Sequence, residues 1–160
     1  MGSGFSAKYE INQASGELSS FGQNGVRSFN AEYLNTFFEE DLAENRIEGW
    51  SIDKNYVANK EKYPLREYRN LGDYSRKGIN NRVTEDPMNE AMSWYKDLAY
   101  GGRRNIRTEG DAIYSEFEDG SFVQFRPISS KPNSPVVELN IVKSDYLKTQ
   151  KIHFQTGEYK

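Results

Sequence analysis

The chain contains one histidine, His153, within a stretch of alternating polar and apolar residues near its C-terminal end. Imidazole is the side chain whose ordinary pKa lets it exchange protons near neutral pH, so any acid–base step that uses an imidazole must use His153. Alternate side chains of an extended strand point to the same face. Thr149, Lys151 and His153 are therefore expected on one open face. Ile152 and Phe154 supply the core on the opposite face.

Two neighbouring segments add polar side chains that could join His153. Strand alternation gives Arg126 and Glu138 positions on polar faces of their segments, and Ser129 and Ser130 follow in a polar loop. An imidazole, fixed cations and hydroxyls without a metal site suit cleavage of RNA through its own 2′-hydroxyl. A base removes the 2′-proton, cations stabilise the phosphorane, and an acid protonates the leaving 5′-oxygen. The alternative is that His153 is an ordinary surface or interface residue.

Residue types that the chain lacks or holds once exclude several kinds of site. The chain has no cysteine, which excludes disulfides, thiolate zinc sites and cysteine nucleophiles. A single histidine argues against a histidine-based zinc site, so neither a metal nor a cofactor is expected. No apolar run has the length needed to span a bilayer, so stable membrane insertion is not expected. Nothing in the composition implies an oligomer.

The charge is unevenly distributed along the chain. The net charge is −3, but the first 50 residues hold 3 basic and 8 acidic side chains, and the remainder hold 18 and 16. Residues 60–82 hold seven basic and three acidic side chains, interleaved with Tyr63, Tyr68 and Tyr74. Basic groups mixed with aromatic rings can hold phosphates and stack bases. The alternative is a solvated surface whose aromatic rings point inward.

The first half of the chain predicts helices. Apolar residues recur at helical spacing over residues 31–45, where Ser28 or Asn30 can cap the helix. A second, short helix is expected over residues 50–63, and a third over residues 87–100, where Asp86 precedes a proline. The remaining predictions are a lead-in or linker over residues 1–28, with one short strand at 8–11, and an irregular segment over residues 66–84.

The second half changes to a period of two. Strands are expected over residues 112–117, 121–126, 136–142 and 150–154, with a hairpin turn at residues 118–120. Helices followed by an antiparallel meander indicate an α+β fold. The predicted architecture is therefore a set of N-terminal helices packed on a C-terminal antiparallel sheet of about four strands.

Three runs in this second half resemble a known class of proteins. They are Asp119-Gly-Ser-x-x-x-x-Arg-Pro-x-Ser-Ser130, Ser134-Pro-Val-Val-Glu-Leu-Asn-Ile141 and Lys148-Thr-Gln-Lys-Ile-His-Phe154. Together they resemble the C-terminal toxin modules of bacterial contact-dependent growth inhibition and related polymorphic toxin systems. The similarity covers about residues 87–154. It implies a small helix-plus-sheet ribonuclease fold of the barnase/colicin type.

The resemblance implies an effector that is carried by an exported surface protein, acts in the cytoplasm of a neighbouring bacterium, and is neutralised by a cognate immunity protein. It implies cleavage of RNA, with tRNA the expected substrate. Composition and the resemblance together give an expected division: a flexible lead-in or linker (1–28), a helical part that could include a translocation segment (29–86) and a nuclease core (87–160). The expected catalytic residues are His153, Lys151, Arg126 and Thr149, and the expected substrate-binding residues are Ser129, Ser130 and Glu138.

Two other functions remain open from the sequence. The first is a toxin of another enzymatic class, such as a DNase or a nucleotide-targeting hydrolase. The second is a non-catalytic binding module that uses the acidic residues after position 38. A metal-dependent nuclease would lose its activity in EDTA, and a binding module would be harmless when it is expressed in a bacterium.

Overall fold

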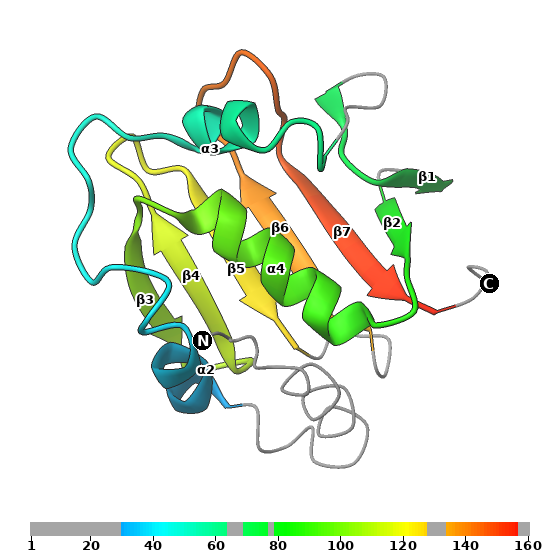
Figure 1. The fold of residues 1–160 in the computed structure, drawn as a ribbon, viewed down its shortest axis with the longest axis horizontal. Coiled ribbons are helices and arrows are strands. Elements are labelled where there is room, and N and C mark those ends of the chain that lie inside the picture. Colours follow the sequence, from blue (N-terminus) through cyan, green and yellow to red (C-terminus); the bar gives the residue numbers. More distant parts are fainter. Residues whose placement is uncertain (1–29, 64–68, 77–78, 128–133, 157–160) are drawn as a thin grey trace.

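The chain folds as α+β, with helices on one face of a seven-stranded sheet (Figure 1). The computed structural model describes residues 30–63, 69–76, 79–127 and 134–156, so the predicted lead-in over residues 1–28 and its short strand lie outside the described part. The helices are α2 (Ala31–Phe37), α3 (Ile52–Ala58) and α4 (Pro87–Ala99). The strands are β1 (Asp73–Arg76), β2 (Ile79–Val83), β3 (Arg103–Arg107), β4 (Ala112–Glu116), β5 (Phe122–Arg126), β6 (Val136–Asn140) and β7 (Gln150–Gln155).

Helix α4 is the central helix and was predicted with nearly the correct bounds. The Asp86 side chain accepts a hydrogen bond from the Asn89 N–H, and Pro87 occupies the first turn, where a missing N–H costs nothing. The predicted apolar stripe, Met88, Ala91, Met92, Tyr95 and Leu98, is buried. The helix ends at Ala99, and Gly101 follows with a φ of +89° that favours glycine.

Helices α2 and α3 are both shorter than the sequence predicted. Asn30 caps α2 by accepting from the Tyr33 N–H at 2.8 Å, but the helix ends at Phe37 instead of residue 45. Acidic side chains crowd residues 39–44, where a continued helix would place them at the negative end of its dipole. Ser51 caps α3, which ends at Ala58, before the predicted residue 63.

The sheet has the strand order β1-β2-β7-β6-β5-β4-β3. The four predicted strands form its antiparallel centre, β4 to β7, and their identity is confirmed. The predicted strand number and the purely antiparallel sheet are wrong, because β1, β2 and β3 extend the sheet and β2 pairs with β7 in parallel. The segment 66–84 was predicted to be irregular because it shows no alternating apolar pattern. Two strands form there, because β2 pairs with the distant strand β7 and β1 pairs with β2.

The hydrophobic core lies between the helices and one face of the sheet. The Trp94 ring on α4 packs edge-on against Tyr63 and against Phe154 of β7, with ring centroids 4.5 and 5.2 Å away. Tyr63 therefore points inward, as expected if the basic segment 60–82 is a solvated surface whose aromatic rings point inward. The side chains of Tyr68 and Tyr74 lie outside the described residues. Because the helices cover one face of the sheet (Figure 1), residues that contact a ligand from the strands must lie on the opposite face.

Candidate functional site

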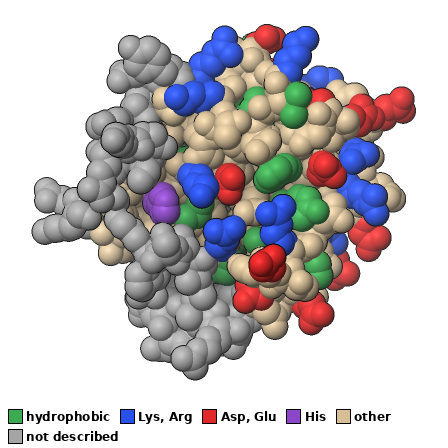
Figure 2. Space-filling view, turned by 180° about the vertical axis from the view of Figure 1, so that it is seen from behind, with side chains coloured by type: hydrophobic (Ala, Val, Ile, Leu, Met, Phe, Trp, Pro, Cys, Tyr) green, Lys and Arg blue, Asp and Glu red, His purple; other side chains and the backbone are tan. Residues whose placement is uncertain are grey.

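Strand β7 carries two of the predicted catalytic residues on the face away from the helices. Gln150, Ile152 and Phe154 are buried, whereas Lys151 is exposed and His153 is half-buried. This alternation confirms the predicted faces of the last strand. Figure 2 shows this side of the molecule, where the single histidine, in purple, lies near basic, acidic and hydrophobic side chains.

Thr149 has a local structural partner in the loop between β6 and β7. Its hydroxyl accepts a hydrogen bond from the Ile141 N–H at 2.9 Å and lies 3.4 Å from the Ile141 carbonyl. The residue precedes β7 and closes the connection between the two strands. The predicted catalytic role of Thr149 remains a prediction, and its hydroxyl contributes to the loop in this structure.

A row of polar side chains crosses the sheet at Lys151. Lys151 pairs with Glu138 of β6, and Glu138 pairs with Gln124 of β5. Paired residues on neighbouring antiparallel strands have Cβ atoms about 4.5–5.5 Å apart on the same face. The Gln124 amide donates to Glu138 Oε1 at 3.5 Å. The structure therefore places the Glu138 carboxylate between a cation and an amide.

A second row crosses the sheet at His153. His153 pairs with Val136 on one side and with Asn81 of the parallel strand β2 on the other. Arg126 lies in the same row beyond Val136, about two strand spacings, or roughly 10 Å, from His153. A Cβ placed on Gly110 would lie 3.8 Å from Arg126 Nε, so Arg126 extends toward the β3–β4 turn.

Buried polar atoms without a described partner gather on this face. Asn81 Oδ1, Gln124 Oε1, Arg126 Nε and Gln155 Nε2 are buried and have no hydrogen-bond partner among the described residues. The side chains of Asn81 and Gln124 are only 4% and 3% exposed. Buried polar atoms are nearly always hydrogen-bonded, so each exception needs an explanation.

The structure thus brings together part of the predicted site. His153, Lys151 and Glu138 are neighbours on adjacent strands, and Arg126 shares their face at a greater separation. Ser129 and Ser130 lie outside the described residues, so their predicted role remains a prediction. Gln124 of β5 lies on the same face and was not among the predicted site residues.

Asn81 was missed because its strand was not predicted. Residues 79–83 read Ile-Asn-Asn-Arg-Val, which gives no period-two apolar signal. Asn81 reaches the site through the parallel pairing of β2 with β7, a contact between segments about 70 residues apart. A polar β-strand whose partner is so distant leaves no local signal that could identify it.

The arrangement supplies the groups for proton transfer near a phosphate. Glu138 and His153 are diagonal neighbours across β6 and β7, so their Cβ atoms are roughly 7–8 Å apart. A ribose with its adjacent phosphate can lie between two side chains at that spacing. No ion pair among the described residues uses Lys151 or Arg126. The described residues contain no cluster of three or more His, Asp or Glu that could hold a metal.

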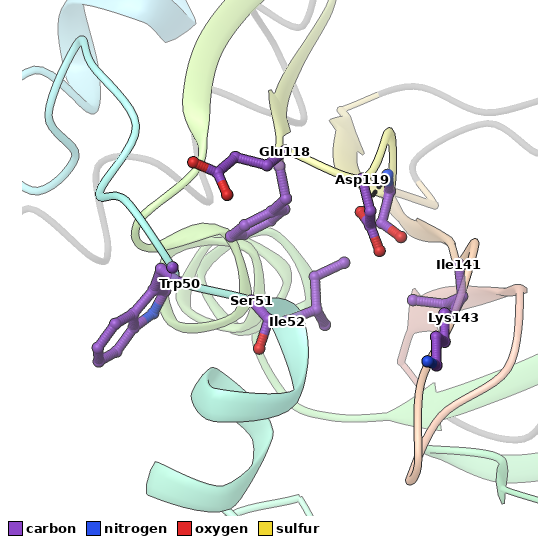
Figure 3. A pocket seen from close by; sticks show the side chains of 10 residues that line it. Trp50, Ser51, Ile52, Glu118, Asp119, Ile141 and Lys143 are labelled. Carbon is purple, nitrogen blue, oxygen red and sulfur yellow. Dashed lines mark hydrogen bonds between the residues drawn. The ribbon is translucent and has the colours of Figure 1, made fainter.

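A pocket of about 180 Å³ lies at the other end of the strands (Figure 3). Trp50, Ser51 and Ile52 line it from the start of α3, and Glu118 and Asp119 line it from the β4–β5 turn; Ile141 and Lys143 lie on the loop after β6. None of the predicted site residues lines this pocket. Its volume is below the roughly 300 Å³ of ordinary ligand sites, so the sheet face is the stronger candidate.

Comparison of the chain with protein-family models, with curated proteins and with solved structures found no match. Among the described residues, no helix is both long and apolar enough to cross a bilayer.

Proposed function

We propose that the protein is a ribonuclease toxin that cleaves RNA, with tRNA as the expected substrate, by metal-independent attack of the 2′-hydroxyl. The observation that carries the proposal is the pairing of β6 with β7, which sets Glu138 and Lys151 beside His153 on the sheet face away from the helices. The sequence resemblance to toxin modules supports the same reaction. The row of Gln124, Glu138 and Lys151 across β5, β6 and β7 adds a polar surface beside His153.

In the proposed mechanism Glu138 and His153 divide the proton transfers. The Glu138 carboxylate removes the proton of the 2′-hydroxyl, and the 2′-oxygen forms a bond to phosphorus. Lys151 stabilises the charge of the phosphorane. Protonated His153 gives its proton to the 5′-oxygen as the bond from phosphorus to that oxygen breaks. The products are a 2′,3′-cyclic phosphate and a free 5′-hydroxyl.

Glu138 was first expected to bind substrate, and here it serves as the base. A single imidazole cannot act as base and acid in one step, so a second proton carrier is needed. Glu138 is the carboxylate whose strand position is nearest to His153 on this face of the described strands. Asn81, which pairs with His153 from β2, can hydrogen-bond the imidazole or the substrate.

The test is single-turnover cleavage of total bacterial tRNA by the purified chain in EDTA. We expect discrete fragments with 2′,3′-cyclic phosphate ends. His153→Ala and Glu138→Gln should each lower the rate by about 100-fold or more, the usual contribution of a general acid or base. If His153 is the acid, the wild-type rate should fall on the alkaline side of its pH profile, and His153→Ala should lose that dependence.

Matched controls separate chemistry from surface charge. Glu118→Gln removes an exposed carboxylate in the β4–β5 turn, and Lys143→Gln removes an exposed amine near the end of β6. Both variants should cleave like the wild type. Fragments that carry 5′-phosphates, or cleavage abolished by EDTA, would identify a metal-dependent nuclease. Intact RNA in arrested cells would point to a toxin of another class, and harmless expression to a binding module.

We also propose that the toxin is delivered from a bacterial surface protein into the cytoplasm of a neighbouring cell, where a cognate immunity protein blocks it. This part depends on the sequence resemblance. The proposal expects that expression in a bacterium without the immunity protein arrests growth. The arrest should disappear in His153→Ala at equal protein abundance, as measured by immunoblot.

A further inference from the structure

A cationic and aromatic cluster lies on the same sheet face, toward the β3 edge. The guanidinium carbon of Arg107 lies 5.1 Å from the centre of the Tyr114 ring. Tyr114 also packs edge-to-face with Phe122, with ring centroids 5.8 Å apart. Both rings are partly exposed and Arg107 is exposed. We call these three residues, Arg107, Tyr114 and Phe122, the aromatic platform.

The strand register connects the platform to the proposed catalytic residues. Tyr114 pairs with Gln124, which pairs with Glu138, so one row of side chains leads from the platform to Lys151. Tyr114 and Lys151 are three strand steps apart, about 14 Å. A single strand of RNA whose phosphate lies at Lys151 can therefore reach the platform with a nearby nucleotide.

The charge on this face suits a polyanion despite the net negative charge of the chain. Among the residues of β3 to β7 that point to it, four are cationic and two are acidic: Arg103, Arg107, Arg126 and Lys151 against Glu116 and Glu138. Arg46 already pairs with Glu116 at 3.6 Å. The exposed side chains of Arg103 and Arg107 lie on β3, next to the strand of Tyr114, and cations beside aromatic rings are typical of surfaces that bind nucleic-acid strands by stacking.

We infer that the aromatic platform is a stacking site for an unpaired nucleobase of the RNA substrate. This inference rests on the proposed function and extends it from the scissile phosphate to a base a few nucleotides away. Aromatic rings and guanidinium planes bind unpaired bases through their faces. The platform therefore favours single-stranded loops over duplexes and contributes little preference among the bases.

The experiment measures binding separately from cleavage. The probe is a fluorescein-labelled single-stranded 2′-O-methyl oligonucleotide, which cannot be cleaved because the attacking hydroxyl is blocked. We expect Tyr114→Leu and Phe122→Leu each to weaken binding by about ten-fold, within the range found for base-stacking aromatic residues. Tyr100→Leu is the matched control, because Tyr100 is exposed in the helical layer and packs against Trp50; this variant should bind like the wild type.

The salt dependence distinguishes stacking from charge. Each phosphate contact contributes a slope of about −0.7 to log K against log salt concentration for single strands. Arg107→Gln should make the slope shallower by about that amount, whereas Tyr114→Leu should lower affinity and leave the slope unchanged. An abasic oligonucleotide of the same length should bind wild type and Tyr114→Leu equally.

Two results would overturn the stacking site. In the first, Tyr114→Leu and Phe122→Leu have a native circular dichroism spectrum and bind the probe like the wild type. In the second, Tyr114→Leu weakens binding of the abasic oligonucleotide as much as it weakens binding of the probe. Absence of probe binding by the wild type would also reject it. Failure of the ribonuclease proposal looks different. The wild type would then leave tRNA intact while still binding the probe, and Tyr114→Leu would still weaken that binding.

Discussion

Tyr63 places its hydroxyl next to a charged carboxylate at the edge of the core. The hydroxyl donates a hydrogen bond to Asp97 Oδ2, which also pairs with Lys62 at 2.7 Å. Burial, and then the negative charge of Asp97, raises the pKa of the Tyr63 phenol far above its ordinary value. The folded protein therefore holds this proton at pH values where the unfolded chain releases it.

This difference predicts a loss of stability in alkaline solution. The contribution of Tyr63 is complete below the unfolded phenol's pKa of about 10 and declines as the pH rises above it, by about 1.4 kcal/mol at one unit above. We expect Tyr63→Phe to flatten the decline in unfolding free energy between about pH 9 and 11. Urea denaturation at several pH values measures the slope. Tyr100→Phe, at an exposed tyrosine, should keep the wild-type slope, and equal slopes in all three proteins would contradict the argument.

The candidate site was partly predictable at the scale of single residues. Period two placed Lys151 and His153 on the open face, because that rule needs only the local sequence. The position of Glu138 next to His153 depends on the register of β6 against β7. A shift of that register by one residue would move the Glu138 side chain to the other face of the sheet. Arg126 extends toward Gly110 in the β3–β4 turn, a direction that strand periodicity does not specify.

Asn55 joins the two helices that meet at the end of α4. Its side chain is 3% exposed, and its Nδ2 donates to the carbonyls of Leu98 and Tyr100, each at 2.7 Å. Its Oδ1 accepts from Trp50 Nε1 at 2.8 Å. The carbonyls at the end of a helix have no partner within the helix. Asn55 of α3 therefore provides the hydrogen-bond donors that the carbonyls at the end of α4 lack within their own helix.

Replacement of this residue should destabilise the fold. We expect Asn55→Ala to lower the unfolding free energy by about 2–4 kcal/mol, since two carbonyls lose their donor in a buried setting. Asn45→Ala, at an exposed asparagine in the loop after α2, should change it by less than about 0.5 kcal/mol. Chemical denaturation of both variants gives the comparison. A similar, small change in both would show that water replaces the lost donors.

Elements with strong local signals were predicted, and elements set by pairing were not. Asp86 and Pro87 fixed the start of α4, and the Asp-Gly turn fixed the β4–β5 hairpin. By contrast, β3 reads Arg-Arg-Asn-Ile-Arg and forms an edge strand, where polar residues are tolerated because one side has no neighbour. The sequence of residues 103–107 alone does not predict a strand, because the strand forms through its pairing with β4.

At the scale of the whole molecule, the hydrophobic core crosses the predicted boundary at residue 87. Leu34, Phe38, Tyr63 and Leu71 precede that boundary and are buried in the same cluster as Trp94 of α4. Strand β2, which also precedes it, is the outer neighbour of β7. The predicted division into a helical part and a nuclease core therefore separates residues that share one core.

This shared core predicts that residues 87–160 alone do not fold cooperatively. Removal of four fully buried apolar side chains forfeits roughly 6–12 kcal/mol at about 1.5–3 kcal/mol each, which is as large as the net stability of an ordinary domain. The fragment should lack near-ultraviolet circular dichroism, whereas residues 30–160 should unfold in one transition detected equally by tryptophan fluorescence and far-ultraviolet circular dichroism. A fragment 87–160 with a sharp transition that cleaves tRNA would establish the nuclease core as independent. In the full chain β7 is paired on both sides, with β6 and with β2, so the fragment would lose one of the two strands that hold His153 and Lys151 in the sheet.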